Sequence, residues 1–108
     1  MAITAVPAAP TAAEDAVAIT VTGLETNDPA TYDAGTYPTE TENRYYLKAV
    51  APAGSTPAQD LVSEVWSCDQ DGEKVLLPWV FPVAGEWTLR VQKAADDSIA
   101  QSQALTVA

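Results

Sequence analysis

The spacing most suggestive of chemistry occurs in the segment Asp69-Gln70-Asp71-Gly72-Glu73. Acidic side chains at alternate positions bring several oxygens into one short loop, and oxygen is the ligand that Ca²⁺ prefers. A complete calcium loop also needs a bidentate glutamate at a later position, and this sequence has none there. Asp-Gly is equally typical of a tight turn between two strands. We interpret the segment as the turn of a β-hairpin and predict no metal site.

A second acidic group lies in the polar, turn-rich stretch 25–43. Its carboxylates belong to Glu25, Asp28, Asp33, Glu40 and Glu42. They either gather around a metal ion or form a solvated surface, which is the more frequent role of acidic runs. A connection near twenty residues long is usually functional or mobile. We interpret the acidic side chains of this loop as solvated.

Catalytic machinery is missing from the composition. The chain has no histidine and one cysteine, Cys68, so a nucleophile would have no base to activate it. Nothing in the pattern places two of the fifteen acidic residues across a cleft, as glycoside hydrolysis requires. A single cysteine also forms no disulfide within the chain. We predict a protein that is not an enzyme and has no cofactor.

The charge of the chain restricts its partners. Fifteen acidic residues against five basic ones give a formal net charge of −10. Such a surface repels phosphate backbones and anionic membranes, so we predict neither nucleic acid nor a membrane as partner. The acidity either keeps the protein soluble or complements a basic partner. The N-terminus lacks the features of a signal peptide, and no apolar run is long enough to cross a bilayer, so we expect a complete, non-secreted product.

Alternation of apolar and polar residues, the pattern of a half-buried strand, dominates the chain. It is clearest in Trp87, Leu89 and Val91, and no stretch has helical periodicity. The expected strands are 2–8, 16–24, 44–51, 61–68, 73–81, 86–93 and 99–107. Seven short strands at turn spacing predict one all-β domain over 1–108, an antiparallel sandwich or barrel. Pro7 and Pro10 make residues 1–13 either an N-terminal arm or a first edge strand.

The segment Val83-Ala84-Gly85-Glu86-Trp87-Thr88-Leu89-Arg90-Val91 resembles the start of strand F in immunoglobulin-like domains. By this resemblance Trp87 takes the place of the corner tyrosine and Leu89 that of the second disulfide cysteine. The first cysteine would correspond to Ile19 or Val21, and the core tryptophan to Trp66 or Trp79. The resemblance implies an immunoglobulin-like antiparallel β-sandwich of about seven strands without a disulfide.

Disulfide-free domains of this kind are familiar in tailed-bacteriophage virions and in bacterial surface proteins. The resemblance therefore implies a virion structural protein, a capsid decoration or accessory subunit assembled in the host cytoplasm. Its partner would be the major capsid protein or another virion protein, with homo-oligomers a further option. The alternative is an adhesion or carbohydrate-binding module of a bacterial surface or secreted protein.

Side chains expected to contact a partner lie in the acidic loop and on two strands. They are Tyr32, Tyr37, Tyr46, Leu76 and Val80. For the carbohydrate-binding alternative, Tyr32, Tyr37, Tyr45, Tyr46 and Trp79 would line one aromatic face. The alternative interpretation is that Tyr45 and the tryptophans are core residues, because aromatic core residues are common in small sandwiches.

Overall fold

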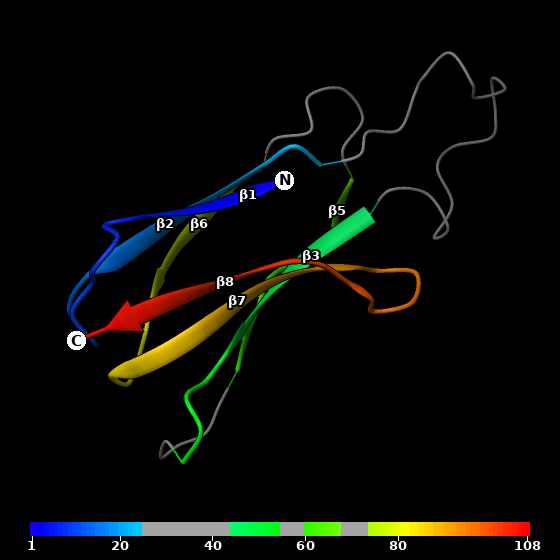
Figure 1. The fold of residues 1–108 in the computed structure, drawn as a ribbon. Helices are drawn as coiled ribbons and strands as arrows, with labels where there is room; N and C mark the ends of the chain where they lie inside the picture. The colour runs from blue at the N-terminus through cyan, green and yellow to red at the C-terminus, as the bar shows by residue number, and fades with distance from the viewer. Residues whose placement is uncertain (25–43, 55–59, 68–73) are drawn as a thin grey trace, which may run out of the picture.

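In the computed structural model, described for residues 1–24, 44–54, 60–67 and 74–108 (backbone only at 67 and 74–77), every regular element is a β-strand. The strands form two antiparallel sheets that face each other across a common core (Figure 1). This arrangement confirms the predicted all-β, antiparallel architecture.

The small sheet has the strand order β1-β2-β6, with β1 at Ala2–Val6, β2 at Ala16–Thr22 and β6 at Lys74–Val80. The large sheet has the order β4-β3-β7-β8. Its strands are β4 (Leu61–Val62), β3 (Arg44–Val50), β7 (Gly85–Lys93) and β8 (Ile99–Val107), and β5 (Trp66–Ser67) pairs with the first residues of β3. The chain stays within one sheet from β1 to β2, from β3 to β5 and from β7 to β8, and it crosses between the sheets after β2, β5 and β6.

The prediction of a single strand at 61–68 is wrong, because the chain there forms the two short strands β4 and β5. Ser63 causes the interruption. Its backbone N–H donates to the Leu47 carbonyl at 2.9 Å, but its hydroxyl, in place of a carbonyl, accepts the hydrogen bond from the Leu47 N–H at 2.8 Å. A side chain that substitutes for a backbone acceptor breaks the ladder locally.

The N-terminal segment passes from one sheet to the other. β1 pairs with β2 and is the edge strand of the small sheet. Beyond Pro7, the Ala108 N–H donates to the Pro10 carbonyl at 2.9 Å and the Ala12 N–H donates to the Ala108 carbonyl at 2.8 Å. These two bonds form one parallel bridge to the end of β8. Residues 1–12 thus tie the two sheets together at one end of the sandwich.

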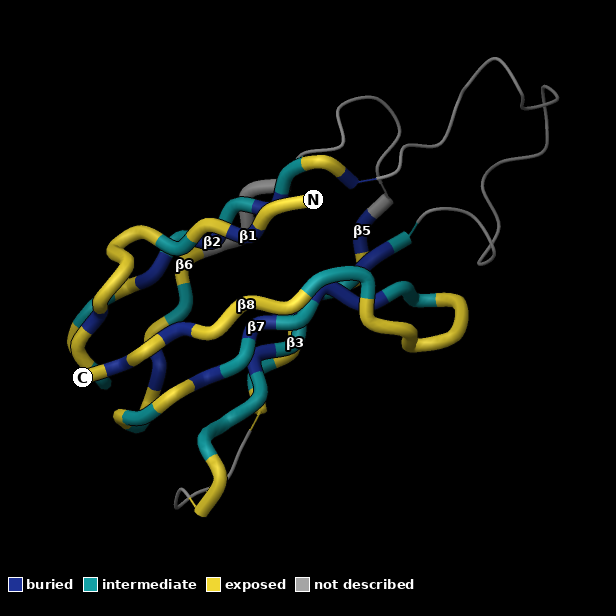
Figure 2. The backbone as a smooth tube through the Cα atoms, viewed as in Figure 1, coloured by how far each residue is buried: buried dark blue, intermediate teal, exposed yellow. Residues whose placement is uncertain are grey.

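Core side chains come from alternate positions of the facing strands, as the periodicity predicts (Figure 2). The fully buried ones are Val17, Ile19 and Val21 of β2, Tyr45, Leu47 and Ala49 of β3, and Trp87, Leu89 and Val91 of β7. Burying a large apolar side chain stabilises the fold by about 1.5–3 kcal/mol. This shared core fixes which side chains of each sheet must point to the outside.

The corner before β7 is built around Trp87. Its indole N–H donates to the Val83 carbonyl at 3.0 Å, and its ring meets that of Phe81 edge to face with centroids 5.0 Å apart. Gly85 has a φ of 134°, and a Cβ there would lie 2.7 Å from the Pro52 ring. Only glycine accommodates both the backbone conformation and that contact.

Candidate functional site

The two outer faces of the sandwich are the surfaces that its strands offer to a partner. We call the outward residues of the small sheet the small-sheet face. They are Ala2, Thr4, Val6, Ala16, Ala18, Thr20, Thr22 and Val80. The outward residues of the large sheet form the large-sheet face. They are Arg44, Tyr46, Lys48, Val50, Val62, Glu86, Thr88, Arg90, Gln92, Ile99, Ser102, Ala104 and Thr106.

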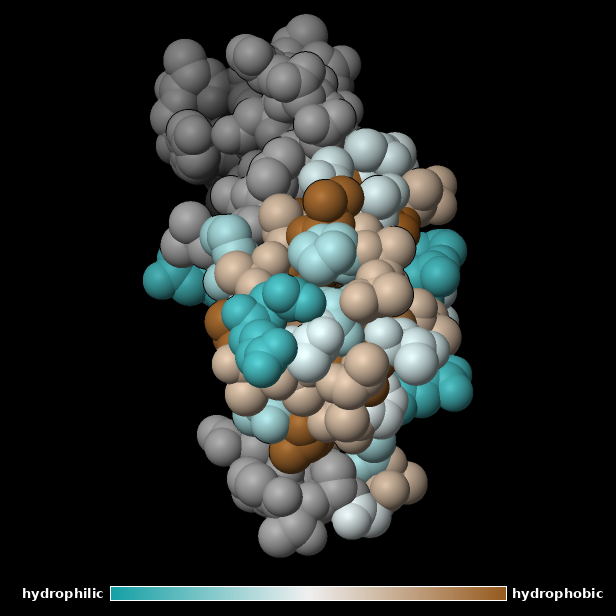
Figure 3. Space-filling view, turned by 90° about the vertical axis from the view of Figure 1, so that its left-hand side faces the viewer, coloured by the Kyte–Doolittle hydropathy of each residue, from teal (hydrophilic) through white to brown (hydrophobic). Residues whose placement is uncertain are grey.

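The described side chains of the small-sheet face are uncharged. Its members are alanines, threonines and two valines, Val6 and Val80, which are 63% and 47% exposed. On the side of the molecule seen in Figure 3, strongly hydrophobic residues appear only as small, separate spots among weakly hydrophobic and hydrophilic ones. Small, uncharged side chains on a sheet give a surface that a partner can cover without desolvating a charge.

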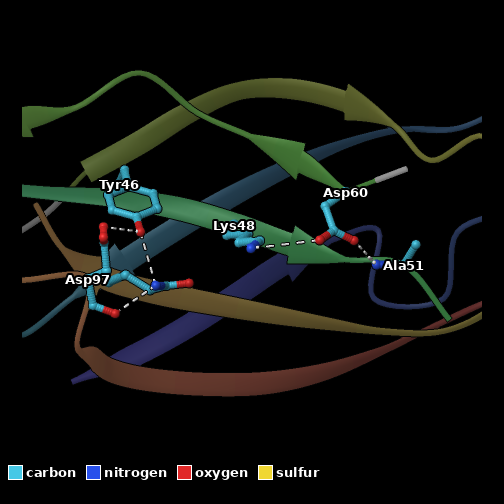
Figure 4. A network of polar contacts seen from close by, with 6 residues as sticks. Tyr46, Lys48, Ala51, Asp60 and Asp97 are labelled. Atoms are coloured by element: carbon cyan, nitrogen blue, oxygen red, sulfur yellow. Dashed lines mark hydrogen bonds and ion pairs between the residues drawn. The ribbon is translucent and has the colours of Figure 1, made fainter. Parts of the chain in front are cut away.

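The large-sheet face carries a polar network at the end of β7 (Figure 4). The Tyr46 hydroxyl donates to Asp97 Oδ1 at 2.7 Å, and Gln92 Nε2 donates to the Tyr46 hydroxyl at 3.0 Å and to the Asp97 carbonyl at 2.8 Å. Gln92 is only 7% exposed, and its Oε1 has no hydrogen-bond partner within the described residues. The network fastens the β7–β8 turn to β3.

The same network changes the acidity of Tyr46. Its hydrogen bond to Asp97, partial burial and the negative charge of Asp97 together raise the pKa of Tyr46 from 10.0 to about 12. The phenol therefore remains protonated, and keeps donating to Asp97, across the physiological pH range. The arrangement is a structural contact, and it does not make Tyr46 a base.

Two cations lie side by side in the middle of this face. Lys48 of β3 and Arg90 of β7 are directly opposite each other in the antiparallel register. Lys48 Nζ is 3.8 Å from Asp60 Oδ2, and Asp60 Oδ1 accepts the Ala51 N–H at 2.9 Å (Figure 4). Within the described part of the chain, the Arg90 guanidinium has neither a hydrogen-bond nor an ion-pair partner. The register thus concentrates positive charge at one place.

The contact residues expected from the sequence lie on different parts of the molecule. Tyr46 belongs to the large-sheet face and Val80 to the small-sheet face, so these two do not form one surface. Leu76 lies in β6 opposite Ile19, and its side chain lies outside the described residues. Tyr32 and Tyr37 also lie outside them.

The aromatic side chains expected to bind sugar do not form one surface either. Tyr45 is fully buried, with its ring centroid 6.2 Å from that of Trp66, and Trp79 packs against the core beside Phe81. Tyr46 points outward from the large sheet. These aromatic side chains are therefore placed as core residues, apart from Tyr46.

The acidic segments considered as metal sites in the sequence are not among the described residues. Both the turn segment 69–73 and the acidic loop 25–43 lie outside the described residues. Within the described ranges, no three His, Cys, Asp or Glu side chains lie together as a metal site would need. Those same ranges contain no helix with the length and apolar character to span a bilayer.

A groove of about 220 Å³ runs along the seam between β1 and β8. Its walls are Ile3, Thr4, Ala5, Ala8, Leu89, Gln103, Ala104 and Leu105. Gln103 is its one long polar side chain, and no titratable group lines it. The groove offers no acid, base or charge with which to hold a reactive ligand.

Sequence patterns alone did not identify the Lys48–Arg90 pair or the Gln92 network. Alternation predicts that Arg90 and Gln92 point outward, but it does not say which residues of β3 lie beside them. That knowledge requires the register between β3 and β7, which are about forty residues apart in sequence.

Comparison with known proteins leaves the chain without an assigned family. No protein-family model, no curated protein and no solved structure matches it.

Proposed function

We propose that this chain is a non-enzymatic structural subunit of a bacteriophage virion, a capsid decoration protein that docks through its small-sheet face. The observation that carries the proposal is the absence of charge from the described side chains of that face, in a chain with a net charge of −10. Depletion of charged residues is the compositional mark of interface cores. Val80, expected from the sequence as a contact residue, lies on this face.

An immunoglobulin-like fold is part of the proposal. The two sheets, β1-β2-β6 and β4-β3-β7-β8, divide the strands as an immunoglobulin-like sandwich does. Trp87 supports the same assignment, because its N–H bonds to a backbone carbonyl four residues upstream, as the hydroxyl of a corner tyrosine does. The short strands β4 and β5 are the departure from a regular seven-strand pattern.

The mechanism would be mechanical. Alanine, threonine and valine side chains let a sheet lie flat against the major capsid protein or another virion protein, and a specific contact needs roughly 1,000 Å² of buried surface or more. Each copy adds its contact area to the shell, and copies grouped around a symmetry axis gain avidity. The negative net charge of the chain would keep the particle surface soluble.

Gold-labelled antibody electron microscopy on a lysate of the native source tests this function. Label over icosahedral heads is the expected result, and it would establish decoration. Label on tails would keep the protein in the virion but move its site. Label on cell envelopes with bare particles would overturn the proposal in favour of surface adhesion.

A further inference from the structure

We propose that the large-sheet face is a second docking surface, which binds an acidic segment of another protein through Lys48 and Arg90. This inference does not depend on the virion role of the small-sheet face, because it concerns the opposite side of the sandwich. It rests on where the few positive charges of the chain are placed and on what surrounds them.

The basic residues of the protein are concentrated on one sheet. Four of its five basic residues, Arg44, Lys48, Arg90 and Lys93, lie on β3 and β7, the two central strands of the large sheet. Among the acidic residues that the structure describes, Glu86 alone lies within a strand. Two of these four, Lys48 and Arg90, lie opposite each other on the large-sheet face, so positive charge is concentrated locally on a protein of negative net charge.

The pair formed by Lys48 and Arg90 destabilises the large sheet locally. Like charges directly opposite each other in an antiparallel pair destabilise a sheet, and Lys48 and Arg90 are such a pair. Lys48 is offset only by Asp60 at 3.8 Å, with both side chains about one-third exposed. Arg90 has no such offset among the described residues. A carboxylate supplied by a partner would lie between the two cations and reduce their mutual repulsion.

The neighbours of the pair favour a protein partner. Val62 lies beside Lys48 on the same face and is 59% exposed, and Ile99, at the far end of the face, is 52% exposed. Arginine and exposed apolar side chains around a flat centre are typical of protein interfaces. Glu86 lies on the same face at the start of β7, and Asp60 and Asp97 border it. A short acidic segment that fits between these carboxylates meets less repulsion than a long phosphate polymer that must pass over them.

Fluorescence anisotropy with a labelled oligoglutamate peptide and the full chain tests the proposal. The wild-type protein should bind the peptide, and added salt should weaken the binding. The double variant Lys48→Gln with Arg90→Gln should bind about tenfold more weakly, since two charge contacts are lost. Amide chemical shifts in the wild-type protein should change on β3 and β7 and stay constant on β1 and β2.

A matched pair of single variants separates this site from net charge. Arg90→Gln and Lys74→Gln remove one positive charge each, but Lys74 lies on β6 of the small sheet. Arg90→Gln should weaken peptide binding and Lys74→Gln should not. Equal effects of the two variants, or no binding at all, would overturn the proposal.

Two further outcomes would assign the face to another occupant and also overturn it. One is single-stranded DNA binding as tightly as oligoglutamate with the same sensitivity to Arg90→Gln. The other is a concentration-dependent dimer in analytical ultracentrifugation that Arg90→Gln dissolves, which would identify a second copy of the chain. A monomer that prefers the peptide to DNA supports the acidic protein segment.

Discussion

The two outer faces of this sandwich are opposites built on one core. Strands β2, β3 and β7 bury every second side chain, with valine and isoleucine on β2 and with aromatic and aliphatic residues on β3 and β7. Outside, the small-sheet face carries alanine, threonine and valine, whereas the large-sheet face carries two opposed cations and a hydrogen-bonded tyrosine–glutamine pair. The core positions therefore determine the fold, and the outward positions determine the charge and polarity that each face presents.

The two faces also differ in whether their outward side chains hold the fold together by hydrogen bonds. On the large-sheet face, Tyr46 and Gln92 hold the β7–β8 turn through Asp97. On the small-sheet face, the outward threonines Thr4, Thr20 and Thr22 have no comparable network among the described residues. Substitutions on the two faces should therefore have different costs even where exposure is similar.

The largest change in the free energy of unfolding is expected for a substitution at Gln92. Replacing Gln92 with alanine removes both hydrogen bonds from its amide and should lower the free energy of unfolding by about 2 kcal/mol. The control is Thr20→Ala on the small-sheet face, which should cost no more than about 0.5 kcal/mol. Urea unfolding measures both. Equal costs would mean that the network does not anchor the turn.

Tyr46→Phe should have a smaller effect, of about 1 kcal/mol, because only the hydroxyl is lost. This variant also isolates a pH dependence. Because the pKa of Tyr46 is raised from 10.0 to about 12, the folded state holds the phenol proton more tightly than the unfolded chain does. Its contribution to stability is complete below pH 10.0 and is lost as the pH rises through about 12.

The measurement is the urea midpoint of wild type and Tyr46→Phe across that pH range. The gap between the two proteins should narrow as the pH rises. A constant gap would show that Tyr46 titrates alike in the folded and unfolded states.

The smallest change in the free energy of unfolding is expected for a substitution at Arg90, and this change is a gain in stability. Arg90→Glu replaces a like-charge pair with an opposite-charge pair beside Lys48 and should raise the free energy of unfolding by about 0.5 kcal/mol. Thermal unfolding at low salt would detect it, and high salt should reduce the gain. A loss of stability would mean that Arg90 has a stabilising contact in the free protein.

Periodicity was enough to predict most of the fold. The alternation in Trp87, Leu89 and Val91 assigned their side chains correctly to the core, and the strand 99–107 has the predicted bounds. It failed at 61–68, because the hydroxyl of Ser63 takes over a backbone role that no apolar pattern records. Hydrogen bonds between distant residues are invisible to local periodicity.

The candidate surfaces were less accessible from sequence than the fold. Tyr46 and Val80 were predicted as contacts, but only the pairing of strands shows that they belong to opposite faces. The Lys48–Arg90 pair likewise arises from register between strands, so neither residue stands out in the sequence. The predictions for Tyr32 and Tyr37 stay predictions.

The most direct test of separate roles uses two exposed valines, one on each face. Val80 on the small-sheet face is 47% exposed and Val62 on the large-sheet face is 59% exposed, so Val80→Glu and Val62→Glu add the same charge in similar settings. The measurement is the copy number of each variant in purified particles by quantitative immunoblot. We predict that Val80→Glu is lost from particles while Val62→Glu stays at the wild-type level. Retention of Val80→Glu, loss of Val62→Glu, or absence of the wild-type chain from particles would contradict the account.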